Sequence, residues 1–278
     1  MGEFTTQQRS YPPGVPCWVD TEQPDPEAAT SFYGGLFGWT FQEVMPPGAP
    51  GSYLIAQLDD RDVAAIGSGT EAASWNTYIA VADADASASA VTSTGGAVLF
   101  GPEDAGPGGR TATCLDPAGA EFRLWQARRR LGAQIANLPG AWNFSVLHTT
   151  DLKQALSFYS TVFGWTADLP EDGTGAMVRL PGYGDHLAAT IDPGIHERQA
   201  AAPPGFADVV AGVQAAGSGE ATHWQVVFTV RRRDESAATA ERLGATVLST
   251  SETVWTKTAL VRDPQGAELV LSEFTPPG

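Results

Sequence analysis

One phrase occurs twice in this chain, as SFYGGLFGWTF at 31–41 and as SFYSTVFGWTA at 157–167. In both copies apolar residues stand at helical spacing in front of the FGW triplet. Phe32 and Phe158 are 126 residues apart (158 − 32), which is about the size of one small domain. The repetition predicts a chain that arose by duplication of such a domain.

A second repeated motif shows that the two copies differ in length. The turns DPAG (116–119) and DPQG (263–266) are offset by 147 residues (263 − 116), and Trp75 and Trp224 head equivalent strands at an offset of 149 (224 − 75). Both offsets exceed 126, so the second half contains an insertion before Trp224, which we place at about 191–222. This Ala/Gly/Pro-rich insertion is either a lid over a cavity or a slack surface loop.

Each half reads as two modules of one strand, one helix and up to three further strands. Asp25 is an expected N-cap with Pro26 at the first helical position, and Gly38 ends that helix. The expected helices are 25–38, 83–96, 151–164 and 234–244; the expected strands include 39–44, 165–169, 175–182 and 186–192. The sequence therefore predicts an α+β fold of four βαβββ modules with curved, mainly antiparallel sheets. Two domains are expected, at 13–128 and 141–276, joined by a linker at 129–140.

Composition limits the possible partners. The chain has 278 residues, 42% of them hydrophobic, which is enough for packed cores. Its 32 acidic and 16 basic residues give a net charge of −16, which disfavours binding to nucleic acid. The basic runs at 128–130 and 231–233 are interpreted as solvated loops or helix ends.

Cysteine usage and hydropathy place the chain in the cytoplasm. Cys17 and Cys114 form no short-range motif, so we expect neither a disulfide network nor a thiolate zinc site, and Cys17 is expected to pack rather than react. No apolar run reaches the length of a membrane span, and the polar start MGEFTTQQRS lacks a signal-peptide core. No membrane association is expected.

The motifs together resemble a known superfamily. The pattern D-x-x-x-A-x-x-FY-x-x-x-FGW, followed by a Trp-headed strand and DPxG, occurs twice and covers roughly 13–128 and 141–275. It is similar to the vicinal oxygen chelate superfamily of glyoxalase I, extradiol dioxygenases and bleomycin-resistance proteins, and most of all to tandem actinobacterial glyoxalase-like proteins. The resemblance implies paired modules around a cleft, which in many members holds a divalent metal ion.

The metal ligands that the resemblance implies are not present. The family positions fall on Trp18, Asn76 and Arg123 in the first half and on Phe144, Gln225 and Val270 in the second. Neither set contains two credible ligands, so we expect no metal and no other cofactor. The four histidines are interpreted as surface or strand-end residues, although a metal site drawn from distant residues stays open.

The same positions define two expected binding clefts. Alternation places Trp18, Asp20 and Glu22 on one face of a strand and Arg123 with Trp125 on one face of another. With Asn76, these residues suit a flat oxygenated aromatic or an anionic molecule, unless Arg123 and Asp20 only pair with each other. The second cleft is more apolar: Phe144, Val270 and Gln225, with His148 near its rim.

These residues predict a metal-independent protein that binds a hydrophobic or aromatic metabolite between modules. His148, Asp20 and Glu22 are the candidate acid–base groups. The protein is either an acid–base enzyme of natural-product metabolism, such as a cyclase, isomerase or hydrolase, or a resistance protein that sequesters a drug. The alternatives are a metal-dependent lyase or dioxygenase with a relocated site and a non-catalytic interaction protein. A monomer or a homodimer is expected.

Overall fold

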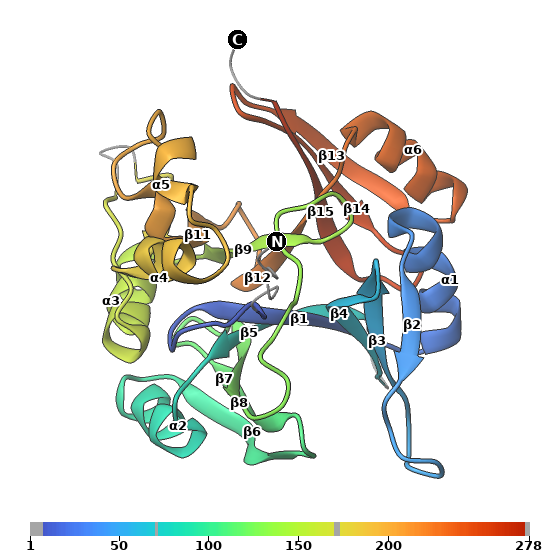
Figure 1. Cartoon of the computed structure of the whole chain (residues 1–278), viewed down its shortest axis with the longest axis horizontal. Helices are drawn as coiled ribbons and strands as arrows, with labels where there is room; N and C mark the ends of the chain where they lie inside the picture. Colours follow the sequence, from blue (N-terminus) through green and yellow to red (C-terminus); the bar gives the residue numbers. More distant parts are fainter. Residues whose placement is uncertain (1–7, 70–71, 170–172, 276–278) are drawn as a thin grey trace, which may run out of the picture. The chain divides into compact units, whose positions relative to one another are not determined.

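The computed structural model describes residues 8–69, 72–169 and 173–275; the first seven residues and the end of the predicted second domain at 276 lie outside them. The first half of the chain contains two complete modules (Figure 1). Their elements are β1 (Pro16–Gln23), α1 (Pro26–Phe37), β2 (Thr40–Glu43), β3 (Tyr53–Leu58) and β4 (Arg61–Ser68), then β5 (Ser74–Ala80), α2 (Ala84–Ser93), β6 (Ala97–Ala105), β7 (Gly109–Leu115) and β8 (Glu121–Ala127).

The second half contains one altered and one complete module. The third module consists of β9 (Trp142–Thr149), α3 (Leu152–Phe163), β10 (Gly175–Arg179), α4 (Tyr183–Thr190), α5 (Ile195–Arg198), the 3-10 helix η1 (Phe206–Asp208) and β11 (Val209–Ala215). The fourth consists of β12 (His223–Thr229), α6 (Arg233–Arg242), β13 (Thr246–Glu252), β14 (Thr256–Arg262) and β15 (Glu268–Phe274).

In every module the last strand pairs in parallel with the first, as β1 with β4, β5 with β8, β9 with β11 and β12 with β15. The remaining pairs inside a module, such as β3 with β4, are antiparallel. The modules contribute to two mixed sheets, of eight strands in the order β2-β3-β4-β1-β5-β8-β7-β6 and of seven in the order β10-β11-β9-β12-β15-β14-β13. The predicted α+β class and modular plan are confirmed.

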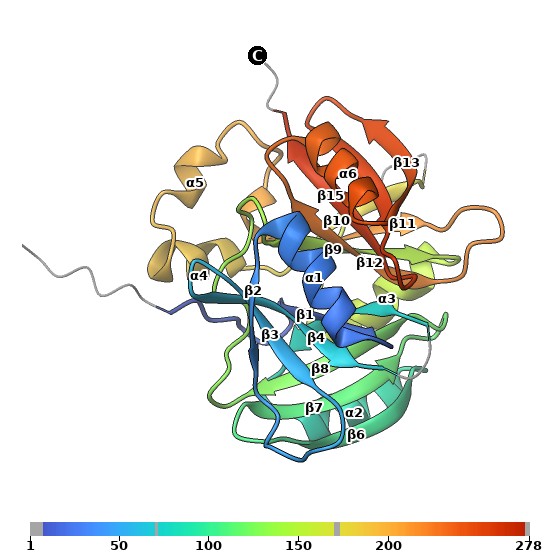
Figure 2. The same ribbon diagram turned by 90° about the vertical axis from the view of Figure 1, so that its right-hand side faces the viewer.

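Backbone contacts divide the chain into two compact units that combine modules from both halves. One unit, here the middle-module unit, comprises Met1–Cys17, Tyr78–Gly132 and Val146–His223, which are essentially modules two and three. The other, the end-module unit, comprises Trp18–Thr77, Ala133–Ser145 and Trp224–Gly278, which are essentially modules one and four. In the end-module unit α1 lies beside α6, as Figures 1 and 2 both show.

The two repeated motifs meet inside each unit. In the end-module unit the Tyr33 hydroxyl donates to Asp263 Oδ2 at 2.8 Å, and Trp75 Nε1 donates to the Tyr33 oxygen at 3.1 Å. In the middle-module unit the Tyr159 hydroxyl donates to Asp116 Oδ2 at 3.2 Å. The tyrosine of FYxxxFGW thus binds the aspartate of a DPxG turn from the other half of the chain, which gives both motifs a structural role.

The tryptophan of each FGW triplet is also fixed by a backbone oxygen. Trp39 Nε1 donates to Gly140 O at 2.7 Å and Trp165 Nε1 to Gly14 O at 2.6 Å. The preceding glycines, Gly38 and Gly164, have φ of 75° and 74°, the left-handed conformation that ends a helix. These contacts hold the buried aromatic layer under α1 and α3.

The third module departs from the predicted strands. The expected strand at 186–192 is wrong, because these residues belong to α4 and the turn after it. Tyr183 and Leu187, four residues apart, are the buried face of α4, so helical rather than alternating burial decides its structure. The expected strand at 165–169 is reduced to one bridge between Thr166 and Arg179. The segment 191–222 contains α5, η1 and β11, so it supplies the closing strand of its module.

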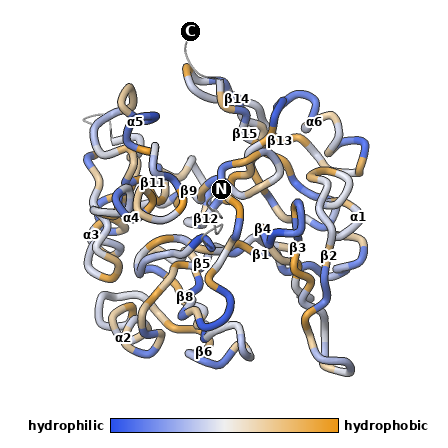
Figure 3. Tube along the Cα trace, viewed as in Figure 1, coloured by the Kyte–Doolittle hydropathy of each residue, from blue (hydrophilic) through white to orange (hydrophobic). Residues whose placement is uncertain are grey.

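The apolar core follows the strands of both sheets. Figure 3 shows hydrophobic residues interspersed with hydrophilic ones along them, whereas the charged start of α6 is hydrophilic. Both cysteines are free and buried, and burial raises the pKa of Cys17 strongly and that of Cys114 to about 12. Within the described ranges, no helix combines the length and apolar character needed to traverse a lipid bilayer.

Candidate functional site

Three of the predicted site residues come together around a buried carboxylate in the end-module unit. Asp20, on β1, is fully buried and lies between Tyr53 and Asn76. The Tyr53 hydroxyl donates to Asp20 Oδ2 at 2.9 Å, and Asn76 Nδ2 donates to Asp20 Oδ1 at 2.9 Å. Trp18 Nε1 donates to the Tyr53 oxygen at 3.1 Å. We call Trp18, Asp20, Tyr53 and Asn76 the Asp20 cluster.

The local sequence explains this cluster in part. Trp18 and Asp20 are two residues apart on β1, so the strand pattern predicted that they share a face. Asn76 lies near the start of β5. Tyr53 was missed. It is the first residue of β3, and its contact with Asp20 depends on the pairing of β3 with β4 and of β4 with β1. Glu22, on the same strand as Asp20, is partly buried.

Arg123 and Trp125 lie on β8 in the middle-module unit. Arg123 Nη1 donates to the Tyr78 hydroxyl at 2.9 Å, and its Nη2 lies 3.7 Å from Glu121 Oε1. Trp125 Nε1 donates to Arg130 O at 2.8 Å, and its ring meets Tyr78 edge-on with centroids 6.3 Å apart. The side chains of Arg123 and Trp125 thus surround Tyr78.

The predicted apolar set is held largely by packing. Phe144 on β9 and Val270 on β15 are partly buried, and Val270 pairs with Val227 across the sheet. Gln225 is buried and its Nε2 donates to Glu268 O at 3.1 Å. The amide of Gln225 therefore satisfies the backbone of the neighbouring strand.

The family metal positions do not fit a metal ion. Trp18, Phe144 and Val270 offer no ligand atom, and Arg123 carries a positive charge. Asn76 directs its amide nitrogen, a donor, at Asp20, and Gln225 directs its own at a carbonyl oxygen. Each set therefore offers at most one amide oxygen, and a single weak ligand of this kind does not hold a cation.

His148 instead joins two residues that the sequence did not connect with it. His148 Nδ1 lies 2.7 Å from Glu220 Oε1, and His223 Nδ1 lies 3.7 Å from the same oxygen. The two imidazole rings are 4.7 Å apart. We call His148, Glu220 and His223 the His–Glu–His cluster; all three side chains are partly exposed and belong to the middle-module unit.

Strand register explains why the sequence did not reveal this cluster. His148 is the penultimate residue of β9, and its partner across the parallel pair with β11 is Gln214. Glu220 follows β11 in a turn, and His223 opens β12. The usable signal is the placement of two histidines at the ends of strands that follow one another in the sheet, but it requires the strand order β11-β9-β12 to be known.

Charge and burial oppose each other in this cluster. Burial and the neighbouring His223 lower the pKa of His148, while Glu220 partly offsets them. Burial alone would raise the pKa of Glu220, yet the Gly217 N–H and His148 hold it below its ordinary value. At neutral pH the cluster therefore presents a neutral His148 imidazole beside an ionised Glu220 carboxylate.

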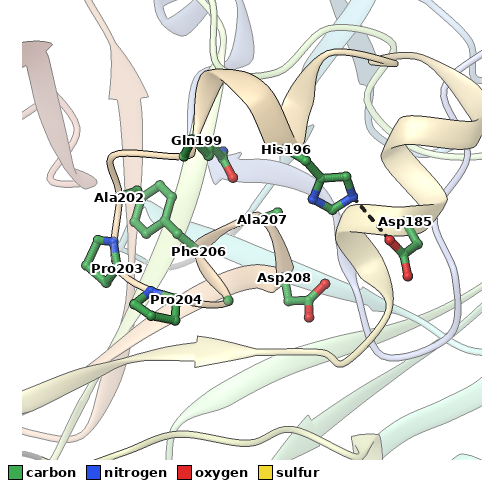
Figure 4. A pocket seen from close by; sticks show the side chains of 11 residues that line it. Asp185, His196, Gln199, Ala202, Pro203, Pro204, Phe206, Ala207 and Asp208 are labelled. Atoms are coloured by element: carbon green, nitrogen blue, oxygen red, sulfur yellow. Dashed lines mark hydrogen bonds and ion pairs between the residues drawn. The ribbon is translucent and has the colours of Figure 1, made fainter.

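The third module also encloses a hollow of about 330 Å³ between α4, α5 and η1 (Figure 4). Pro203, Pro204 and Phe206 line one part of it, and His196 Nε2 pairs with Asp185 Oδ1 at 3.1 Å at another. Most of this hollow lies in the inserted segment at 191–222, which the sequence analysis interpreted as either a lid or a surface loop. No predicted site residue lines it.

Comparison with known proteins identifies the family of this chain. The model of the glyoxalase-like domain matches residues 18–125 and 145–272. The chain is 34% identical over 272 residues to "Putative glyoxylase CFP32" of Mycobacterium tuberculosis, covering 94% of this chain and 95% of that protein. It is 33% identical over 285 residues to the anthracycline biosynthesis protein DnrV of Streptomyces peucetius, covering 95% and 94%.

Solved structures are similar in fold alone. The Mn(II)-bound glyoxalase of Novosphingobium aromaticivorans superimposes with a TM-score of 0.60 at 14% identity, covering 96% of this chain and 85% of that one. The 2,3-dioxygenase LapB of Pseudomonas sp. KL28 superimposes with a TM-score of 0.62 at 10% identity, covering 95% and 93%. One fold thus holds a glyoxalase and a ring-cleaving dioxygenase.

Proposed function

Because this chain belongs to the glyoxalase-like domain family, whose metal positions here lack ligands, we propose that it is a metal-independent enzyme of natural-product metabolism. In this proposal it binds a flat, oxygen-bearing aromatic metabolite at the Asp20 cluster and moves a proton on it through Tyr53. The carrying observation is the chain of hydrogen bonds from Trp18 through the Tyr53 hydroxyl to the buried Asp20 carboxylate.

The cluster supports proton transfer because its members have fixed roles. Asn76 donates to one oxygen of Asp20 and Tyr53 to the other, so the Tyr53 hydroxyl offers the carboxylate a path for a proton. When Tyr53 takes a proton from a bound C–H or O–H acid, its own proton passes to Asp20 Oδ2. The Trp18 N–H stabilises the charge that develops on the tyrosine oxygen during this transfer, which moves the negative charge from Asp20 to the substrate. The reverse transfer returns the proton to the rearranged product.

The ligand class rests on the relatives and on the side chains of the cluster. Two curated relatives from Streptomyces are named as anthracycline biosynthesis proteins, and anthracyclines contain fused aromatic rings with hydroxyl and carbonyl groups. An indole and a phenol beside a carboxylate offer stacking surface and hydrogen bonds to such rings. Sequestration without turnover, as in resistance proteins, would use the same contacts without the proton path.

The test is binding and turnover of a panel of hydroxylated anthraquinones by the purified chain. We expect saturable binding, seen as quenching of tryptophan fluorescence, and an altered product by mass spectrometry for at least one member. Tyr53→Phe removes the proton path but keeps the ring, so it should lower kcat by about 100-fold or more with a smaller change in binding. Asp20→Asn should have a similar effect on kcat.

A matched control is Trp255→Ala, because Trp255 is an exposed aromatic residue that stacks on Phe274 in the end-module unit. It should leave both binding and turnover unchanged. Binding that is lost in Trp255→Ala and kept in the Asp20 cluster variants would contradict the proposal. Binding without turnover that is insensitive to Tyr53→Phe would favour sequestration.

A further inference from the structure

We propose that the His–Glu–His cluster is a binding site for a divalent transition-metal ion such as Zn²⁺. The cluster is built from residues other than the family metal positions and other than the Asp20 cluster, so the inference does not depend on the proposed enzymatic function. It rests on the ligand types, on their separation and on the groups that hold them.

The three side chains are close enough to share one ion. One potential ligand atom from each of His148, Glu220 and His223 lies within 4.8 Å of the others. Zinc bonds to imidazole nitrogen and carboxylate oxygen are about 2.0–2.2 Å long, so two ligands of one ion stand at most about 4.4 Å apart and usually about 3.4 Å. The widest pair has to approach by up to about 1.4 Å (4.8 − 3.4), which rotation of these partly exposed side chains can supply.

The ligand set is the one that transition metals prefer. Two imidazoles and one carboxylate occur in catalytic zinc sites and in facial triads, which keep further positions open to water or to a ligand. The side chains of His148, Glu220 and His223 are 17%, 34% and 39% exposed, so an ion has an entry path and open positions. The net charge of −16 also favours cations over anions near the surface.

Neighbouring groups orient the three side chains, as hydrogen bonds to the ligating residues do in metal sites. The Gly217 N–H donates to Glu220 Oε2 at 2.5 Å, which leaves Oε1 turned towards the histidines. His223 Nδ1 lies 2.9 Å from Ala221 O, and the tautomer that donates to this oxygen keeps the lone pair of Nε2 for an ion. Gln214 lies 3.0 Å from His148 Nε2. Its amide can present oxygen by rotation, which would fix Nδ1 as the ligand.

The other two histidines lack a comparable setting. His186 pairs with Ser10, and His196 pairs with Asp185. Across the ranges 8–69, 72–169 and 173–275, no second group of three His, Cys, Asp or Glu side chains approaches as closely. His196 therefore serves as a control for adventitious binding of metal by a partly exposed histidine.

The test uses Co²⁺ as an optical probe of the full chain after treatment with a chelator. We expect one Co²⁺ per chain, visible absorption bands of a four- or five-coordinate ion, and their loss on addition of Zn²⁺. His148→Gln, His223→Gln and Glu220→Gln keep the approximate shape of each side chain, and each should weaken binding by about tenfold or more. His196→Gln should bind as the wild type does.

Binding that is absent at about 1 mM Co²⁺ and Zn²⁺ in the wild type, or that is unchanged in all three cluster variants, overturns the proposal. A thermal unfolding series with and without Zn²⁺ provides a second measurement, since a bound ion raises the apparent stability of the folded chain. This shift should vanish in the cluster variants. Asp20→Asn should keep metal binding, so failure of the metal site and failure of the proposed enzyme are separable.

Discussion

Asp116 and Asp263 are the first residues of the two DPxG turns, and they differ in the hydrogen bonds that stabilise their carboxylates. Asp263 accepts from Tyr33 and from Gln23 Nε2, both at 2.8 Å, in addition to three backbone N–H groups of its own turn. Asp116 accepts from Tyr159 at 3.2 Å and from two backbone N–H groups of its turn at 2.9 Å. Burial raises the pKa of Asp116 above its ordinary value of 3.8, because these bonds only partly offset the loss of water.

The raised pKa of Asp116 predicts a pH effect on the stability of the folded chain. Since the folded chain holds the Asp116 proton more tightly than the unfolded chain, the free energy of unfolding should fall as pH rises from 3.8 through the raised pKa. Above that window the loss is complete. Urea unfolding of wild type and Asp116→Asn across this pH range measures the effect, and the variant should lack this component. Parallel curves for the two proteins would contradict the assignment.

Tyr33 and Tyr159 allow a matched comparison of the same substitution. Tyr33→Phe removes the donor to Asp263 at 2.8 Å, and Tyr159→Phe removes the donor to Asp116 at the longer distance of 3.2 Å. We expect each substitution to lower the free energy of unfolding by about 1–3 kcal/mol, with the larger effect for Tyr33→Phe because its bond to the aspartate is shorter. Chemical denaturation of both variants tests this order. An equal or reversed effect would show that the hydroxyl contacts do not set the difference.

Among the elements, the helices that begin at a capping aspartate and end at a left-handed glycine follow local rules. Asp25 accepts from Ala28 N at 3.0 Å and Asp151 from Gln154 N at 2.9 Å, as the sequence predicted for the first of them. The closing strand of the third module was not predictable in this way. Its position depends on parallel pairing with β9, after an inserted stretch that forms α5 and η1.

The same division applies to the candidate sites. Trp18 and Asp20 could be grouped because period-two alternation is a local property of a strand, and Asn76 could be added only through the position that the family resemblance implies. Glu220 and His223 could not be grouped with His148, because more than 70 residues separate them and only the register of β9 with β11 brings them together. Tyr53 was missed for the same reason, since its contact with Asp20 depends on sheet order.

Helix packing gives a prediction for Gly35 on α1. A Cβ added there would lie 3.0 and 3.1 Å from the two terminal carbons of Leu243, which follows α6. Gly35→Ala should change stability by less than about 1 kcal/mol, because the gain in helix propensity offsets the displacement of Leu243. In a Leu243→Ala background the same change should stabilise by about 0.5–1 kcal/mol. A double-mutant cycle by urea unfolding measures the coupling, and no coupling would place the helices farther apart.

At the scale of the whole molecule, the contact units do not coincide with the halves of the sequence. The end-module unit draws on residues before Thr77 and after Trp224, and the middle-module unit on both sides of the linker at 129–140. The ranges 13–128 and 141–276 therefore describe the repetition in the amino-acid sequence, which differs from the division into contact units. The packed cores, in contrast, join Tyr33 to Asp263 and Tyr159 to Asp116.

Separating the chain between Gly132 and Ala133 tests this organisation. Each half would lack part of the core of both units, so we expect neither to unfold cooperatively alone. Mixing the halves should restore a cooperative transition, followed by circular dichroism, and a complex of both fragments on size exclusion. A cooperative transition of either half alone, with the stability of the intact chain, would show that the sequence repeats are independent domains.

The contact between Phe37 and Phe228, whose rings lie 5.0 Å apart, has a consequence for biogenesis. A ribosome adds about 5–20 residues per second, so the aromatic side of α1 waits on the order of tens of seconds for its partner to be translated. The middle modules can assemble first, because their last residue, His223, emerges earlier. The nascent N-terminal module is thus the part of this chain that most needs shelter by a chaperone.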